Sequence, residues 1–143
     1  MDALVWSGLF SPLLGFLVLL LFGSLLSRKW VSLIGCGSVL ISFFCFTSIL
    51  ILFLMQDLSF FKETLFVWIP VPSINADFAV LIDSLSLLMT LIVTGIGFLI
   101  HLYSIGYMEH DEDYARYFSC MNFFIFSMLL LVLASNLALM FVG

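Results

Sequence analysis

Charge is scarce in this chain of 143 residues: Asp, Glu, Lys and Arg make up 9% of it, whereas 64% of its residues are hydrophobic. A soluble domain of this size has too small a core to hide so much apolar surface. The composition therefore excludes a soluble globular domain and predicts an integral membrane protein. Only four residues are basic and the net charge is −5, which argues against a nucleic-acid partner.

Cysteine is rare as well, and its placement excludes a disulfide framework. Cys36, Cys45 and Cys120 all lie inside apolar runs rather than in the spaced pattern of a small disulfide-stapled domain. The start of the chain, Met1-Asp2-Ala3, has no basic segment. For that reason we do not expect the first apolar run to be a cleavable signal peptide.

Long apolar runs are what the sequence does contain. Because about 20 apolar residues cross a bilayer as a helix, we predict spans at residues 9–26, 31–55, 84–107 and 117–134. Pro12 falls in the first turn of the first predicted span, and Asn122 is the strongest hydrogen-bonding side chain of the fourth. Ser135 and Asn136 indicate a turn and a helix cap, after which a further helix begins.

The segment at residues 56–83 has a different pattern. Apolar and polar residues alternate from Ile74 to Asp83, and residues 64–69 precede a proline-rich turn that ends at Ser73. We predict a β-hairpin on the membrane surface that leans on helices or on a partner. The expected organisation is two transmembrane helices at 1–55, the hairpin at 56–83, two helices joined by an acidic loop at 84–135, and the start of a truncated fifth helix at 136–143. The fold class is thus all-α: a polytopic transmembrane helix bundle with a short extra-membrane β-hairpin.

The basic residues predict an orientation. Arg28, Lys29 and Arg116 fall in loops on one side of the predicted bundle, and Lys62 falls on the other. Positive charge in short loops favours the cytoplasmic or matrix side. Both ends of the chain and the hairpin are therefore expected to face outward, and the acidic loop inward.

The third span carries a polar stripe. At roughly 100° per residue, Asp83 and His101 point the same way, and Ser86, Thr90, Thr94 and Gly97 lie near that direction with Ser104 just beyond. The opposite face is apolar. Small and hydroxyl residues on a membrane helix usually serve packing, whereas ionisable groups in a membrane segment mark pathways or paired sites. Both interpretations stay open, and the candidate proton-pathway residues are His101, Asp83, Thr90, Thr94 and Ser104.

The acidic loop at residues 108–116 invites a metal-site interpretation, with four carboxylates and His110. It lacks a regular ligand spacing and the glycine turn of a calcium loop, so a solvated loop is favoured.

A membrane cytochrome needs two imidazoles at membrane depth. Only His101 qualifies, because His110 lies in the loop.

An ordered series of short motifs from Asp83 onward resembles one family. The motifs are Asp83-Ser84-Leu85-Ser86, Val93-Thr94-Gly95-Ile96-Gly97, His101-Leu102-Tyr103-Ser104, Gly106-Tyr107-Met108, Arg116-Tyr117-Phe118 and Asn122-Phe123-Phe124. In this order they are similar to the antiporter-like membrane subunits of respiratory complex I, which include subunit L of bacterial NADH-quinone oxidoreductase and chain 5 of mitochondrial NADH dehydrogenase. Ser135 stands where many relatives have Asp.

The resemblance implies a longer protein of many helices, with this chain as its N-terminal portion. It implies proton pumping coupled to quinone reduction on other subunits, no cofactor on this chain, and the lipid bilayer and other membrane subunits of the complex as partners. The implied location is the bacterial inner membrane, or the mitochondrial inner membrane in a eukaryote. The alternatives are a subunit of an Mrp-type sodium/proton antiporter and a structural membrane module without transport.

Overall fold

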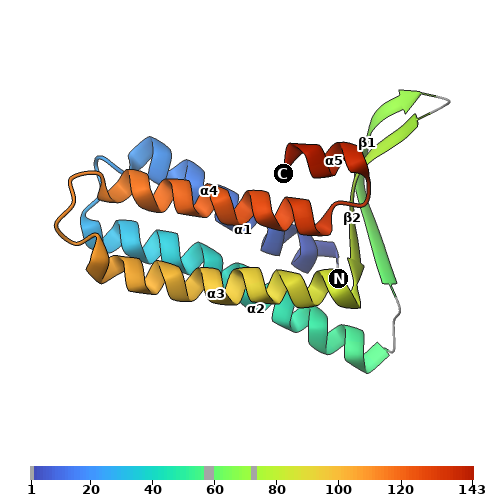
Figure 1. Ribbon diagram of the computed structural model, residues 1–143, viewed down its shortest axis with the longest axis horizontal. Helices are drawn as coiled ribbons and strands as arrows, with labels where there is room; N and C mark the ends of the chain where they lie inside the picture. The colour runs from blue at the N-terminus through green and yellow to red at the C-terminus, as the bar shows by residue number, and fades with distance from the viewer. Residues whose placement is uncertain (1, 57–59, 72–73) are drawn as a thin grey trace.

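The computed structural model describes residues 2–56, 60–71 and 74–143. Within this part of the chain, four helices are long and apolar enough to cross a membrane: α1 (Asp2–Phe22), α2 (Arg28–Gln56), α3 (Ser84–Tyr107) and α4 (Tyr114–Leu133). Figure 1 shows them side by side, with the α1–α2 and α3–α4 connections at one end of the bundle and the hairpin at the other. The predicted helix bundle is confirmed, and the third span has the predicted bounds.

The first span begins earlier than predicted, and this changes the place of Pro12. Because α1 starts at Asp2, Pro12 lies inside the helix rather than in its first turn. A proline has no N–H to give to the carbonyl four residues before it, which here is Gly8 O. The hydroxyl of Ser42 on α2 donates to that oxygen at 2.7 Å. A hydroxyl from a neighbouring helix thus replaces the lost backbone bond, as membrane helices require.

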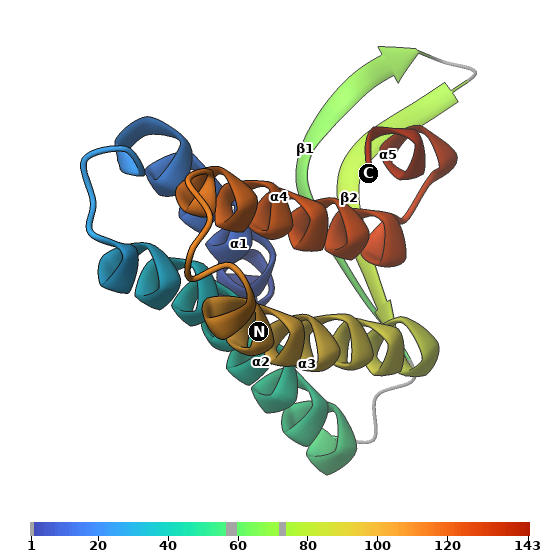
Figure 2. The same cartoon turned by 60° about the vertical axis from the view of Figure 1, so that its left-hand side comes forward.

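The hairpin is present as predicted, with a longer first strand. Strands β1 (Phe60–Val71) and β2 (Ile74–Asp83) pair antiparallel, from Phe60 opposite Asp83 to Val71 opposite Ile74. The predicted turn residues Pro72 and Ser73 lie outside the described residues. Figure 2 shows the hairpin beside the ends of the helices. Its second strand contacts the segment that follows α4, since the N–H of Ser135 donates to Ala79 O at 3.2 Å.

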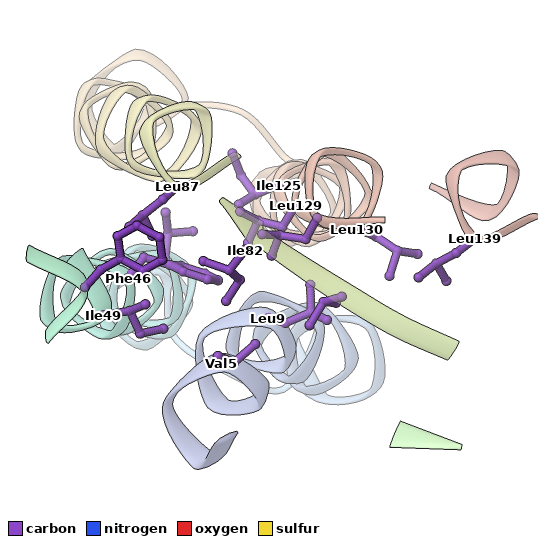
Figure 3. Close-up of a cluster of buried hydrophobic side chains, with 14 residues drawn as sticks. Val5, Leu9, Phe46, Ile49, Ile82, Leu87, Ile125, Leu129, Leu130 and Leu139 are labelled. Atoms are coloured by element: carbon purple, nitrogen blue, oxygen red, sulfur yellow. The ribbon is translucent and has the colours of Figure 1, made fainter. Parts of the chain in front are cut away.

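The apolar core fills the space that the helices and β2 enclose (Figure 3). Phe46, Ile82 and Leu129 are fully buried there although they come from three distant segments of the chain. The outer face of α3 is exposed, as its pattern predicts. The predicted apolar residues Leu85, Leu88, Ile92, Ile96, Leu99 and Tyr103 are all exposed, as are Met89, Ile100, Leu102 and Tyr107. This division of buried and exposed faces suits a helix that contacts lipid or a neighbouring subunit on one side only.

A short helix, α5 (Leu137–Val142), turns back beside α4 (Figure 1). The predicted cap is confirmed, because the side chain of Asn136 accepts a hydrogen bond from Leu139 N at 2.9 Å. The last residue, Gly143, lies against the α4 backbone, where an added Cβ would stand 2.8 Å from Leu131 N.

The end of the bundle opposite the hairpin gathers most of the basic residues. Arg28 and Lys29 begin α2, and Arg116 lies in the first turn of α4. Arg28 donates to the backbone oxygen of Glu109 and lies 5.6 Å from the ring centroid of Tyr114. This side chain therefore ties the start of α2 to the loop before α4. The direction in which this end faces across the membrane stays a prediction.

Candidate functional site

The polar stripe of α3 faces into the bundle. Thr90, Thr94 and His101 are fully buried, and Ser104 is 2% exposed. Asp83 does not share this environment, because it precedes the helix at the hairpin end and is partly exposed. We divide the stripe into a hairpin-side half (Ser86, Thr90 and Thr94) and a loop-side half (Gly97, His101 and Ser104).

In the hairpin-side half, the threonine hydroxyls bond to their own helix. Thr90 donates to Ser86 O at 2.7 Å, and Thr94 donates to Thr90 O at 2.8 Å. Such bonds satisfy a buried hydroxyl without a partner on another helix. The geometry of Thr90 and Thr94 is therefore typical of small polar residues that let membrane helices pack closely.

Asp83 forms a capping box with Ser86. Ser86 N donates to Asp83 Oδ1 at 2.8 Å, and Asp83 N donates to Ser86 Oγ at 2.9 Å. Two backbone N–H groups at the start of α3 are satisfied in this way. Hydrogen bonds from Ser86 hold the pKa of the Asp83 carboxyl below its usual range. Asp83 is therefore the N-cap of α3.

His101 lies at the centre of the loop-side half. Its Nδ1 is 2.8 Å from Gly97 O, and its Nε2 is 3.2 Å from Oδ1 of Asn122 on α4. The ring of Phe118 lies beside the imidazole, with centroids 5.9 Å apart. A carbonyl oxygen can only accept, so the contact with Gly97 places a hydrogen on Nδ1. The ring is thereby fixed on α3 through one nitrogen and presents the other to α4.

Asn122 extends this contact to two further helices. The single hydroxyl hydrogen of Ser38 on α2 has two acceptors within reach, Gly35 O at 2.9 Å and Asn122 Oδ1 at 3.3 Å. On α1, Gly15 has no side chain, and an added Cβ would lie 2.7 Å from Asn122 Nδ2 and 2.5 Å from Ser38 Oγ. We call His101, Asn122 and Ser38 the His101 cluster. It joins α2, α3 and α4 with α1 closely packed against it.

Sequence reasoning missed part of this cluster. The sequence marks Asn122 as a strong hydrogen-bonding residue in an apolar span, but nothing in it pairs Asn122 with His101. Ser38 sits near Gly35 and Gly37, which favours an interpretation as a small packing residue. The spacing of α3 predicts only which way His101 points. Its partners depend on how the helices pack against one another.

A second link between helices lies one turn beyond His101. The hydroxyls of Ser104 and Tyr117 are 3.0 Å apart, and Ser104 also donates to Ile100 O at 2.8 Å. Tyr117 is partly exposed near the start of α4. A hydroxyl pair thus stands between His101 and the loop end of the bundle.

Titratable side chains are sparse inside the bundle. Among the described residues no Asp, Glu, Lys or Arg is buried, and the buried titratable side chains are His101, Cys36 and Tyr114. No three His, Cys, Asp or Glu side chains of the described segments are grouped so as to hold a metal ion. The acidic loop is exposed: Glu109, Asp111, Glu112 and Asp113 all face solvent. Chemically, the site can hold or release one proton at His101.

Comparison with known proteins gives consistent matches. Residues 68–118 match the family model described as NADH-ubiquinone oxidoreductase (complex I), chain 5 N-terminus. The chain is 40% identical over 134 residues to NADH-quinone oxidoreductase subunit L of Mycobacterium tuberculosis (strain ATCC 25618 / H37Rv), which is 92% of this chain and 21% of that protein. It is 39% identical over 132 residues to the protein of the same name from Escherichia coli (strain K12), covering 92% of this chain and 22% of that protein. The chain thus spans about a fifth of the length of these relatives.

Proposed function

Because the chain is related in sequence to the N-terminal portion of NADH-quinone oxidoreductase subunit L, we propose that it forms the first helices of the antiporter-like, proton-translocating membrane subunit of an NADH:quinone oxidoreductase. In this proposal the protein is a multi-pass protein of the inner membrane. NADH is oxidised and quinone reduced on other subunits, and this chain carries no cofactor. Its neighbours are lipid and the other membrane subunits of the complex.

One observation carries the role of this segment: His101 is fully buried within α3, a helix long and apolar enough to cross a membrane, and has a hydrogen-bond partner on another helix. Burying an ionisable side chain in a membrane protein is costly, and such residues usually serve transport or pairing. Imidazole exchanges protons near neutral pH. We assign His101 as a residue that takes up and releases a proton during translocation.

The remaining stripe residues divide between two tasks. Ser104 and Tyr117 form a hydroxyl pair on the loop side of His101, which suits them to pass protons between His101 and that end of the bundle. Thr90 and Thr94 bond within their own helix and serve packing in this proposal. Asp83 caps α3 and stabilises the connection between β2 and this helix.

The test replaces His101 in the full-length protein within its membrane complex. His101→Gln keeps an amide of similar reach but has no proton to exchange. Inverted membrane vesicles are given NADH in sodium-free buffer, and the number of protons moved per electron is measured together with the subunit level by immunoblot. We expect near-normal subunit level and a lower proton-to-electron ratio.

Asp83→Asn is the matched control, because Asn also caps helices but carries no charge. It should keep the parent ratio. A parent ratio in His101→Gln at normal subunit level would reject the role of His101. A proton signal that depends on added sodium would instead identify a sodium/proton antiporter.

A further inference from the structure

The His101 cluster contains an apparent conflict of hydrogen bonding. Nδ1 of His101 carries a hydrogen, because it lies 2.8 Å from the carbonyl oxygen of Gly97. A neutral imidazole then has a bare lone pair on Nε2. That lone pair would face Asn122 Oδ1, which is also an acceptor, at 3.2 Å. With its oxygen toward Nε2, the Asn122 amide suits the imidazolium form, in which Nε2 also carries a hydrogen.

A second observation concerns the other end of the same amide. Asn122 is fully buried, yet its Nδ2 has no hydrogen-bond partner among the described residues. An orphaned buried donor is rare and costs free energy. In the orientation that suits imidazolium, Asn122 thus satisfies its oxygen twice, through His101 and Ser38, and its nitrogen not at all.

Turning the amide by 180° removes the clash of acceptors for neutral His101 and gives Nδ2 two partners, and it leaves Oδ1 as the amide atom without a partner among the described residues. The oxygen and nitrogen of an Asn amide exchange places with almost no change of shape. Nδ2 would then take the position 3.2 Å from His101 Nε2 and 3.3 Å from Ser38 Oγ. It could donate one hydrogen to each, while the Ser38 hydroxyl donates to Gly35 O at 2.9 Å.

We propose that Asn122 is a positioning residue whose side-chain amide turns when His101 gains or loses its proton. Its oxygen faces the imidazolium and its nitrogen faces the neutral ring. The proton binds and leaves at Nε2, taken from hydronium and returned to water, while Nδ1–H stays on Gly97 O. This inference rests on the proposed function, in which His101 exchanges protons.

Gly15 leaves room for the Asn122 amide to rotate. A Cβ at this position would lie 2.7 Å from Asn122 Nδ2 and 2.5 Å from Ser38 Oγ, closer than real Cβ contacts. Glycine on α1 therefore keeps the space beside the amide free of a side chain. The same close approach brings α1 against the cluster.

Few other ionisable groups face His101. On α4, the Phe118 ring next to His101 also contacts Tyr114, and Tyr117 bonds Ser104. On α2, the buried Cys36 belongs to the same apolar cluster as Phe118. Along α1 the sequence has no titratable side chain beyond Asp2. In the part of the chain that the structure describes, the groups that hydrogen-bond His101 directly are thus Gly97 O and the Asn122 amide.

The test is a titration of His101 by nitrogen NMR in the full-length protein within its membrane complex. Histidine is labelled with 15N, and subtracting the spectrum of His101→Gln isolates the two ring nitrogens. In the parent protein we expect neutral His101 to carry its hydrogen on Nδ1. An Nε2–H tautomer would overturn the inference, because Asn122 could then accept from it in both states without turning. This measurement needs no folded variant of Asn122.

Two substitutions of Asn122 should move the titration midpoint in opposite directions. Asn122→Asp places a fixed carboxylate beside Nε2 and should raise the midpoint by about one to three pH units. Asn122→Leu removes the acceptor for the imidazolium and should lower it by about one to two pH units. Thr94→Val, which removes only a hydroxyl that bonds within α3, is the control and should leave the midpoint in place. An unmoved midpoint in Asn122→Asp would overturn the inference.

The outcome separates this inference from the proposed function. Shifted midpoints with a normal proton-to-electron ratio in His101→Gln would support the turning amide and reject the translocating role of His101. An unmoved midpoint with a reduced ratio would reject the turning amide alone.

Discussion

The two halves of the buried face of α3 satisfy the hydrogen bonds of their polar side chains in different ways. In the hairpin-side half, Thr90 and Thr94 satisfy their hydroxyls on carbonyls of their own helix. In the loop-side half, His101 and Ser104 reach across to Asn122 and Tyr117 on α4. A polar group satisfied within its helix sets no condition on its neighbours. A polar group that is hydrogen-bonded to another helix fixes how the two helices pack. It can gain or lose a proton only if its partner rearranges its hydrogen bonds.

The largest effect should come from filling the space where α1 meets the loop-side half. In Gly15→Ala the added Cβ would meet Ser38 and Asn122 at 2.5–2.8 Å, and overpacking of this kind costs about 1–3 kcal/mol. We expect a lower thermal unfolding midpoint in detergent and less assembled protein in membranes. Gly37→Ala is the control, since a Cβ there meets nothing within 4 Å. Equal behaviour of the two variants would show that the approach of α1 is not close.

A smaller effect is expected where the stripe starts. Asp83→Ala removes the cap of α3 and should cost about 0.5–2 kcal/mol, towards the lower value because Asp83 is partly exposed. Hydrogen bonds from Ser86 lower the pKa of Asp83. Its contribution to stability is therefore complete above the usual pKa of Asp, near 4, and is lost as pH falls through the lowered value.

The measurement is the unfolding midpoint between about pH 2 and pH 7, where Asp83 titrates. Asp83→Asn should keep most of the stability while losing the part of the acid dependence that Asp83 supplies. If Asp83→Asn is as unstable as Asp83→Ala, the side chain acts through its charge and not as a cap.

The smallest effect belongs to the hairpin-side half. Thr90→Val and Thr94→Val keep the shape of the side chain and remove only a hydroxyl that bonds within α3. Each should change the free energy of unfolding by less than about 0.5 kcal/mol, because an apolar group of the same shape leaves no unmet partner on another helix. A loss above about 1 kcal/mol would place these hydroxyls in a network that extends beyond α3.

The sequence predicts the stripe well because the spacing of residues along a single helix determines which side chains share a face. Thr90, Thr94, His101 and Ser104 face inward together, whereas Asp83, which the same spacing puts on the stripe, lies before the helix and caps it. The hairpin and the Asn136 cap are also local patterns. All of these depend on spacing within one segment of the chain.

What the sequence did not predict depends on contacts between segments. Pro12 lies inside α1, and the carbonyl it leaves free is bonded by Ser42 on another helix. Ser38 and Asn122 join His101 only because α2 and α4 pack against α3 at that level. A serine among glycines carries no sign of such a partner. Without the packing of the bundle, the cluster could not be assembled from its residues.

The most direct test of the difference between the halves is a double-mutant cycle on the free energy of unfolding of the full-length protein in mixed detergent micelles. The first cycle combines His101→Gln with Asn122→Leu, and the second combines Thr94→Val with Asn122→Leu. We expect a coupling energy of about 0.5–3 kcal/mol in the first cycle and additivity within about 0.5 kcal/mol in the second. Additivity in both cycles would contradict the account, because His101 would then be no more tied to α4 than a threonine bonded to its own helix.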